Sequence, residues 1–304
     1  MTDRYAVIGQ PIAHSQSPRI HRLFAAQTGA DLCYEAIEVA PGALANTLKH
    51  LHADGYRGLN VTLPHKAAVA ALCELVSDRA KVAGAVNTLL RTPTGWSGDN
   101  TDGEGFLRDL KRWGFEVTGK RVLLLGAGGA VRGILKPLLD AKPAELTLSN
   151  RNPWKPEELA ESFKPFGPIR ACTHIALKGD RYDLIVHATS VGHTGKFLRL
   201  PGQLLAEAGA AGYDLSYGDA HTPFAQWARA QGAAQISDGL GMLVEQAALS
   251  FQLWRGRMPD AVAVLKELRS TVGHAENSEN SSPVKSRKSG MCTEDRNSRG
   301  DSVD

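Results

Sequence analysis

Glycine residues cluster at one point of the chain where their backbone could hold a phosphate group. The run RVLLLGAGGAVRGILKPLL, residues 121–139, places them directly after an apolar, strand-like segment and before a helical pattern. Backbone N–H groups at the start of such a helix, together with the helix dipole, bind pyrophosphate. Val131 replaces the last glycine of GxGxxG, so the motif alone leaves a plain glycine-rich turn as an alternative. The predicted phosphate loop comprises Gly126, Ala127, Gly128, Gly129 and Ala130.

The end of the next predicted strand indicates which dinucleotide is bound. Dinucleotide-binding folds usually present an acidic residue to the ribose hydroxyls there, roughly 20 residues beyond the glycines. This sequence has Asn150 and Arg151 instead. A guanidinium offers a planar fork to a ribose 2′-phosphate and can stack on adenine, whereas a carboxylate would repel the phosphate. The predicted cofactor is therefore NADP(H), with Lys155 either as a second cation at the phosphate or as a solvated lysine.

Short polar motifs recur at the ends of predicted strands. They are GQPIAHSQSP at 9–18, NVTLPHK at 60–66, AVNT at 85–88 and GDNTDGEGF at 98–106. In this order, and ahead of GAGGA, NR, ATSVG, YDLSYG and GLGMLVEQAA, they resemble the shikimate dehydrogenase (shikimate 5-dehydrogenase) family from about residue 5 to residue 270. The resemblance implies a reversible, NADPH-dependent reduction of 3-dehydroshikimate to shikimate, in the pathway to chorismate and the aromatic amino acids. It also implies a substrate-binding domain and a Rossmann-type NADP-binding domain separated by a cleft.

The resemblance assigns the chemistry to two side chains, Lys66 and Asp102, which match the family's catalytic pair. Negative charge develops on the carbonyl oxygen as hydride arrives, and an ammonium can stabilise that charge and donate a proton. Asp102 would orient the ammonium and bind a substrate hydroxyl. Which of the two groups is the formal acid stays open.

The remaining implied contacts come from residues at matching positions of the family's motifs. Shikimate is a small acid with three ring hydroxyls, so a selective site needs short hydrogen-bonding side chains. Ser15 and Ser17 would hold the carboxylate near the N-terminus of the first helix, where the dipole favours an anion. The other implied substrate-binding residues are Thr62, Asn87, Tyr217 and Gln246. The other implied cofactor-binding residues are Thr189, Ser190, Leu215, Gly239 and Met242.

Several of these residues have plainer explanations when each is taken singly. Ser17 can be a helix cap, Asp102 can cap the helix that starts there, and Lys66 can be a surface cation. Three further polar residues of these motifs are interpreted as structural or orienting groups: His14, Asn60 and His65.

Two histidines depart from the expected pattern. His187 precedes ATSVG where Asn is usual, and His193 follows Gly192 where Met or Leu is common, so the loop on the nicotinamide side is expected to be altered. The ten histidines show no HExxH-type spacing, and no metal is predicted.

Three alternatives to the predicted activity differ from it in what the site would need. A quinate/shikimate dehydrogenase would accommodate a further ring hydroxyl, and Ser15 and Ser17 favour shikimate without deciding the matter. A ligand-sensing regulator would have no need for Lys66 and Asp102 as a proton-donating pair. An unrelated Rossmann reductase would have to match the many motifs of the N-terminal part by coincidence.

The elements that position these residues alternate in type along the chain. From Tyr5 to about Arg91, strand-like runs alternate with helical patterns, which is typical of a parallel-type α/β domain. A second alternating unit begins with RVLLLG at Arg121 and continues through ELTLSN, YDLIVHATS, AAGYDLSY and AAQIS, which predicts a doubly wound sheet.

The domain boundaries follow from this alternation. The predicted substrate-binding domain spans residues 1–104 and includes helices in 240–273 that return to it, and the NADP-binding domain spans 105–239. Residues 274–304 contain no Leu, Ile, Phe, Tyr or Trp, so they cannot bury a core and are predicted to form a disordered tail.

Composition supports a globular protein of the cytoplasm. Of the 304 residues, 42% are hydrophobic and 22% charged, and the net charge of +3 is scattered, which argues against a nucleic-acid partner. No apolar run approaches the roughly 20 residues of a membrane span, and no secretory signal precedes the first domain. The widely spaced cysteines are interpreted as reduced thiols: Cys33, Cys73, Cys172 and Cys292. A homodimer is left open.

Overall fold

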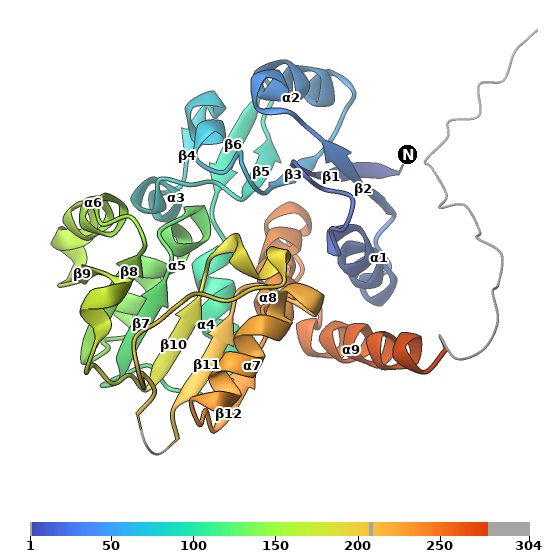
Figure 1. Ribbon diagram of the computed structural model, residues 1–304. Helices are drawn as coiled ribbons and strands as arrows, with labels where there is room; N and C mark the ends of the chain where they lie inside the picture. The colour runs from blue at the N-terminus through green and yellow to red at the C-terminus, as the bar shows by residue number, and fades with distance from the viewer. Residues whose placement is uncertain (1, 207–208, 279–304) are drawn as a thin grey trace, which may run out of the picture. The chain divides into compact units, whose positions relative to one another are not determined.

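Two β-sheets, each built from a separate part of the sequence, organise the chain (Figure 1). The computed structural model describes residues 2–206 and 209–278. Within this part, each sheet has six strands. The strands of the first sheet end by Asp99, and those of the second begin at Arg121. The predicted α/β architecture is therefore confirmed.

The first sheet is mixed, not parallel, and has the order β2-β1-β3-β5-β6-β4. Its strands are β1 (Asp3–Gly9), β2 (Leu32–Glu38), β3 (Gly58–Val61), β4 (Leu75–Val76), β5 (Thr88–Arg91) and β6 (Trp96–Asp99). β1 is parallel to β2 and β3, whereas β5 is antiparallel to both β3 and β6. The expectation of a parallel-type domain is wrong for this sheet, because residues 92–95 are too few for the crossover that parallel neighbours need.

Helices lie between and after the strands of the first part. They are α1 (Ser17–Thr28), α2 (Leu44–Ala53), α3 (Asp78–Ala83) and α4 (Asp102–Arg112). In α1, Ile20 and Phe24 lie one turn apart and are fully buried. The helix ends at Thr28, and the φ of 67° at the following Gly29 favours glycine. Ser17 does not cap α1, because it already belongs to the helix and Gln16 takes the N-cap position.

The second sheet is parallel throughout and has the order β12-β11-β10-β7-β8-β9. Its strands are β7 (Arg121–Leu125), β8 (Glu145–Asn150), β9 (Arg170–Thr173), β10 (Leu184–His187), β11 (Ala211–Asp214) and β12 (Gln235–Ser237). Counted from β9, the strands come third, second, first, fourth, fifth and sixth in the sequence, the doubly wound order with its switch point between β7 and β10. The predicted doubly wound sheet is confirmed. Its helices are α5 (Gly129–Asp140), α6 (Trp154–Phe163) and α7 (Thr222–Ala230).

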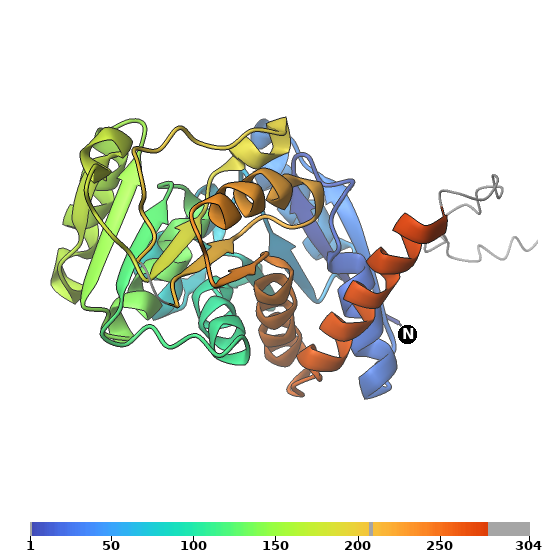
Figure 2. The ribbon, with the colours of Figure 1, turned by 60° about the horizontal axis from the view of Figure 1, so that its bottom comes forward.

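After β12, the chain contacts the first sheet again. In α8 (Leu240–Arg255), the Trp254 indole donates to the Leu89 carbonyl at 2.9 Å, and the Ser250 and Thr88 hydroxyls lie 2.7 Å apart. α8 also runs beside α4 (Figure 2). Within the described residues, the last helix is α9 (Ala261–Ser278), so residues 274–278 of the predicted tail are helical. Residues 279–304 lie outside the described part.

Short 3-10 turns complete the described structure. They are η1 (Pro41–Ala43), η2 (Ala68–Leu72), η3 (Lys164–Phe166), η4 (His174–Leu177), η5 (Ser190–Thr194) and η6 (Gly218–His221). None of the described helices is both long enough and apolar enough to cross a membrane.

The cysteines follow the sequence prediction only in part. Cys73 and Cys172 are free thiols, as expected. Cys33 is disulfide-bonded, so the prediction of a reduced thiol is wrong there, because spacing along a chain does not decide which sulfur atoms meet in space. Cys292 lies outside the described residues.

Candidate active site

Lys66 and Asp102, 36 positions apart in the sequence, form an ion pair at the edge of the first sheet. The Lys66 Nζ lies 2.6 Å from Asp102 Oδ2. Lys66 belongs to the segment that follows β3, and Asp102 is the first residue of α4. Their side chains are 15% and 4% exposed. The lysine side chain is therefore partly open to solvent, whereas the Asp102 side chain is held inside the protein.

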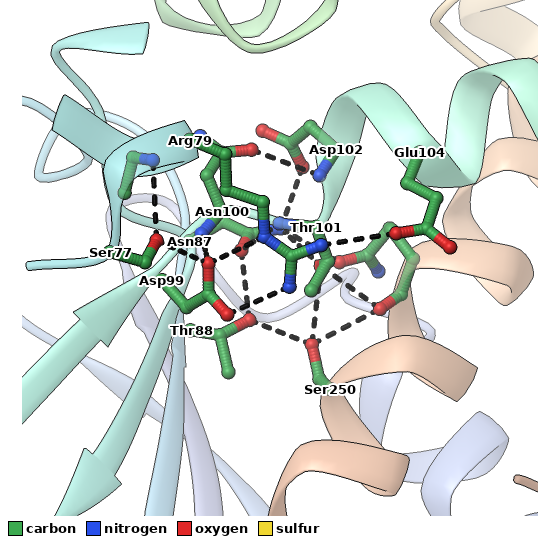
Figure 3. A network of polar contacts seen from close by, with 12 residues as sticks. Ser77, Arg79, Asn87, Thr88, Asp99, Asn100, Thr101, Asp102, Glu104 and Ser250 are labelled. Carbon is green, nitrogen blue, oxygen red and sulfur yellow. Dashed lines mark hydrogen bonds and ion pairs between the residues drawn. The ribbon is translucent and has the colours of Figure 1, made fainter. Parts of the chain in front are cut away.

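Asn87 fixes the other oxygen of the carboxylate and joins three elements. Its Nδ2 donates to Asp102 Oδ1 and to Thr101 Oγ1, each at 2.8 Å, and lies 3.1 Å from Gln246 Oε1 in α8. Its Oδ1 accepts the Thr101 N–H at 2.9 Å. The predicted residues Asn87, Asp102 and Gln246 are thus brought together in one buried network. Figure 3 shows Asn87 and Asp102 within it.

A second layer of polar groups holds the start of α4 in place. Asn100 Oδ1 accepts the Asp102 N–H at 3.0 Å, and Asn100 Nδ2 donates to the Ala85 carbonyl at 2.8 Å. The Arg79 guanidinium donates to both oxygens of Asp99 at 2.7 Å, as Figure 3 shows. Burial would raise the pKa of Asp99, but hydrogen bonds from Arg79 and Ser77 hold it below its ordinary value.

This supporting layer could not be predicted from the sequence. Asp99, Asn100 and Thr101 stand inside the motif GDNTDGEGF, but nothing in the motif says that their side chains bind backbone groups and Arg79. Ser250 carried no signal, because its partners Asn60 and Thr88 are about 160 to 190 residues away.

A further predicted group of residues meets at the start of α1. The Ser17 backbone N–H donates a hydrogen bond to Ser15 Oγ at 3.3 Å. Ser17 itself is buried. Tyr217, which follows β11, lies against the Gln16 backbone: burial raises the pKa of its phenol, and the hydrogen bond with Gln16 opposes that rise. Thr62 packs against Gly9, at the end of β1. A residue that follows a strand of the second sheet therefore contacts the start of α1, beside the two serines.

The predicted phosphate loop lies between β7 and α5. Gly126 has a φ of 124°, and a Cβ there would be 2.7 Å from the Ala188 carbonyl oxygen, so the position needs glycine. Gly128 is the N-cap of α5. A Cβ added at Gly128 would have no atom within 4 Å apart from those of its own chain neighbours. A Cβ on Gly129 would be 3.9 Å from Lys66 Cβ. The start of α5 is therefore open at Gly128 and adjacent to the Lys66–Asp102 pair.

Helices α4 and α5 cross at two glycines. A Cβ on Gly103 would collide with the Gly133 carbonyl oxygen, and one on Gly133 would lie 3.0 Å from Asp102 Cβ. The crossing brings the helix that carries Asp102 against the helix that begins at the phosphate loop.

The residues predicted to select NADP end β8 and begin the next loop. Asn150 Oδ1 accepts the Arg151 N–H at 2.8 Å. The side chains of Arg151 and Lys155 are exposed, and neither forms an ion pair within the described part of the chain. Burial and the positive charge of Arg151 lower the pKa of His174. Two uncommitted cations therefore face solvent near the end of β8.

The remaining predicted cofactor residues follow β10, β11 and β12. Thr189 and Ser190 begin the loop after β10, and Leu215 comes directly after β11. A Cβ on Gly239 would collide with the Leu215 carbonyl, so these two segments pack closely. Met242 is buried in the first turns of α8. Within the described residues, no group of three or more His, Cys, Asp or Glu side chains is arranged to hold a metal ion.

The sheet order, the glycine loop after β7 and the neighbouring ammonium–carboxylate pair define a dinucleotide-dependent oxidoreductase of the Rossmann class. Family models match three stretches of the chain: the shikimate dehydrogenase substrate binding domain at 7–89, shikimate / quinate 5-dehydrogenase at 110–194, and the shikimate 5′-dehydrogenase C-terminal domain at 239–269.

Relatives match nearly the whole length. The shikimate dehydrogenase (NADP(+)) of Halorhodospira halophila is 48% identical over 271 residues, covering 88% of this chain and 99% of the relative. The chain belongs to the shikimate dehydrogenase family.

Solved structures have the same fold. An Ael1 enzyme from Pseudomonas putida superimposes with a TM-score of 0.81 at 41% identity, over 88% of this chain and 98% of that one. The shikimate 5-dehydrogenase of Thermus thermophilus, in complex with NADP(H) and shikimate, gives 0.79 at 36% identity, over 88% of this chain and 99% of that one.

Proposed function

We propose that this chain catalyses the reversible, NADP-dependent reduction of 3-dehydroshikimate to shikimate, a step of the shikimate pathway. The observation that carries the proposal is the Lys66–Asp102 pair, 2.6 Å apart and adjacent to the start of α5 at Gly129. A proton-donating group and a dinucleotide-binding loop therefore lie side by side. Relatives named shikimate dehydrogenase (NADP(+)) at 48% identity support the substrate and the cofactor.

The chain's own groups fit NADP(H). The N-terminus of α5 at Gly128 has room for a phosphate, and its free amides and helix dipole favour an anion. Arg151 and Lys155 offer uncommitted positive charge for a 2′-phosphate, and no carboxylate stands at the end of β8 to repel it. When bound, the cofactor supplies or accepts the hydride.

Lys66 supplies the proton and stabilises charge on the substrate oxygen. An ammonium has three donors, and one of those on Lys66 goes to Asp102 Oδ2. The other two are available to a substrate oxygen. Asn87 holds Asp102 Oδ1 and so opposes rotation of the carboxylate, while Asn100 holds the Asp102 backbone amide at the start of α4. The carboxylate therefore fixes the direction of the ammonium. Asp102 also accepts a substrate hydroxyl.

The substrate residues supply hydrogen bonds matched to a small hydroxylated acid. Ser15, Ser17 and Tyr217 bind the carboxylate near the start of α1, and Thr62, Asn87 and Gln246 bind the ring hydroxyls. The packing of Tyr217 against Gln16 supports the first assignment, and the bonds of Asn87 support the second.

Initial rates of cofactor reduction test this function. Shikimate with NADP⁺ is compared with quinate and NADP⁺, and with shikimate and NAD⁺. We expect rapid turnover only for the first pairing. Comparable turnover of quinate would move the assignment to the quinate/shikimate dehydrogenases, a substrate range that the name of one matching family model includes. No turnover in any pairing would favour a ligand-sensing regulator, against which the intact Lys66–Asp102 pair argues.

Our proposal extends to the organisation and location of the protein. The substrate-binding domain comprises residues 1–104 with the helices of 240–273, the NADP-binding domain comprises 105–239, and the ligands meet in a cleft between them. The hydrogen bonds from α8 to the first sheet support the assignment of α8. The enzyme works in the cytoplasm, without a nucleic-acid or membrane partner, as a monomer or a homodimer.

A further inference from the structure

His187, the last residue of β10, is completely buried between aromatic rings and polar partners. Its ring stacks on Phe224, with centroids 5.5 Å apart and an interplanar angle of 10°, and meets the edge of Phe197 at 5.1 Å. These contacts fix the plane of the imidazole. Both ring nitrogens are therefore aimed at defined neighbours.

The first of these neighbours is Asp214, the last residue of β11 and also buried. Burial would raise the pKa of this carboxyl, but hydrogen bonds from His187 and His221 hold it below its ordinary value. An ionised carboxylate only accepts hydrogen bonds. The His187 Nδ1, 3.0 Å from Asp214 Oδ1, must therefore carry a proton and donate it.

The second neighbour is Thr189, whose Oγ1 lies 2.6 Å from His187 Nε2. Thr189 is the N-cap of η5, and its Oγ1 accepts the Val191 N–H at 3.4 Å. In the neutral imidazole that donates from Nδ1, Nε2 is an acceptor, so the Thr189 hydroxyl donates to it. The oxygen of that hydroxyl is then oriented by the histidine and can only accept from a ligand.

His187 thereby connects the loops that follow β10 and β11. Asp214 Oδ1 also accepts the Ser216 N–H at 2.9 Å, which fixes the start of the β11 loop. Gly192 in η5 packs so closely on Ala220 in η6 that a Cβ would collide with the Ala220 carbonyl. In a doubly wound sheet, the strands on this side of the switch point serve the second nucleotide of the cofactor, which here is the nicotinamide half.

We propose that His187 is a positioning residue for the nicotinamide half of NADP(H): it orients the Thr189 hydroxyl and ties the β10 loop to Asp214, so that the loop is pre-formed when the cofactor binds. This inference rests on the proposed function. It adds a determinant of cofactor affinity that lies beneath the binding loop and makes no contact with the substrate. Pre-forming a loop raises affinity because less ordering remains to be done on binding.

The test compares two ligands that differ only at the nicotinamide. His187→Phe keeps a ring in the aromatic stack and removes both hydrogen-bonding nitrogens. Dissociation constants are measured by titration calorimetry for NADP⁺ and for 2′-phospho-ADP-ribose, which carries the 2′-phosphate and pyrophosphate but no nicotinamide. We expect a five- to tenfold weaker affinity for NADP⁺, about the loss of one hydrogen bond, and less than a twofold change for the fragment. An equal loss for both ligands would mean that the residue only supports the fold, and unchanged affinity for NADP⁺ would remove it from cofactor binding; either result overturns the proposal.

Thr189→Val provides a second, nearly isosteric variant that removes the hydroxyl and keeps the aromatic rings around His187. If His187 acts through the Thr189 hydroxyl, the double variant should bind NADP⁺ no more weakly than Thr189→Val alone, because the second change removes an interaction already lost. Additive losses would contradict that route. Turnover of shikimate by the unmodified enzyme, measured in parallel, separates the two questions: a chain that binds NADP⁺ but does not oxidise shikimate would refute the proposed substrate while the binding comparison still decides the role of His187.

Discussion

Replacement of Lys66 by methionine separates the catalytic from the structural contribution of the ion pair. Methionine keeps most of the length of the side chain and removes the ammonium. Asp102 Oδ2 then loses its partner at 2.6 Å, whereas Oδ1 keeps the Asn87 amide at 2.8 Å. An unpaired carboxylate that is fully buried costs about 3 to 5 kcal/mol. Because the lysine side chain is 15% exposed, water can replace part of the bond, and we expect a loss of about 2 kcal/mol in the free energy of unfolding.

The effect on turnover should be larger than the effect on stability. Loss of a positioned proton donor lowers kcat by roughly 10² to 10⁴, which corresponds to about 3 to 5 kcal/mol in the activation barrier. The KM for shikimate should change less. The assays are the initial rate of NADP⁺ reduction with saturating shikimate and urea unfolding at the same temperature.

A double variant supplies the control. Asp102→Asn added to Lys66→Met removes the unpaired charge, so it should regain about 1 to 2 kcal/mol of stability without regaining turnover. The reasoning is refuted if Lys66→Met keeps turnover within threefold of the unmodified enzyme. It is also refuted if the double variant recovers stability and turnover together, because the loss would then be one of folding.

Three further outcomes are expected. Arg151→Ala should weaken the binding of NADPH by about 1.5 to 3 kcal/mol and leave the binding of NADH unchanged, as measured by fluorescence titration. Equal losses of affinity for the two cofactors would rule out a contact between Arg151 and the 2′-phosphate. Gly133→Ala, whose Cβ would lie 3.0 Å from Asp102 Cβ, should lower kcat roughly tenfold, whereas Gly42→Ala, with open space around it, should leave kcat unaltered. Burial lowers the pKa of His21 to about 3, so between pH 6.5 and 3 the unfolded chain binds a proton that the folded chain does not, and stability falls as the pH falls. At pH 5 the loss is about 2 kcal/mol, and urea unfolding of His21→Phe at pH 7 and pH 5 should lack it; an unchanged pH dependence would exclude His21 as its source.

The doubly wound sheet could be predicted because its strands are apolar along their whole length. Val122, Leu123, Leu124 and Leu125 of β7 are all fully buried, and such runs between helical patterns have few other interpretations. Strands β4, β6 and β9 were missed, because β4 has two residues and the other two carry polar or small side chains. Their pairing is decided by neighbouring strands and not by their own composition.

The direction of the strands in the first sheet was predicted wrongly for a similar reason. Alternation of strand and helix does not reveal that Thr92 and Gly95 close a hairpin between β5 and β6, although the Pro-Thr-Gly sequence before β6 is a turn signal. Whether two neighbouring strands are parallel or antiparallel depends on the length of the segment that joins them. A short joining segment makes them antiparallel, even where strands and helices alternate along the rest of the domain.

The site could be predicted where residue types themselves carry chemistry. Lys66, Asp102, Asn87 and Gln246 were named in advance and lie in one hydrogen-bonded network. Their supporting residues could not be found in the same way, since an asparagine that holds a backbone amide is indistinguishable in sequence from one in an ordinary turn. From the sequence, His187 is only a residue that stands where Asn is usual. The structure shows its hydrogen-bond partners, Asp214 and Thr189.

The return of α8 to the first sheet has a consequence for the order in which the protein can be made. Asn60 and Thr88 belong to strands synthesised early, yet the hydroxyl that satisfies both of them is Ser250, and Trp254 reaches the Leu89 carbonyl from the same helix. A growing chain presents all strands of the parallel sheet before it presents α8. The half of the molecule translated first is therefore the last to be finished, and a ribosome that stalls after β12 releases a chain whose nucleotide-binding sheet is whole and whose first sheet lacks a buried helix.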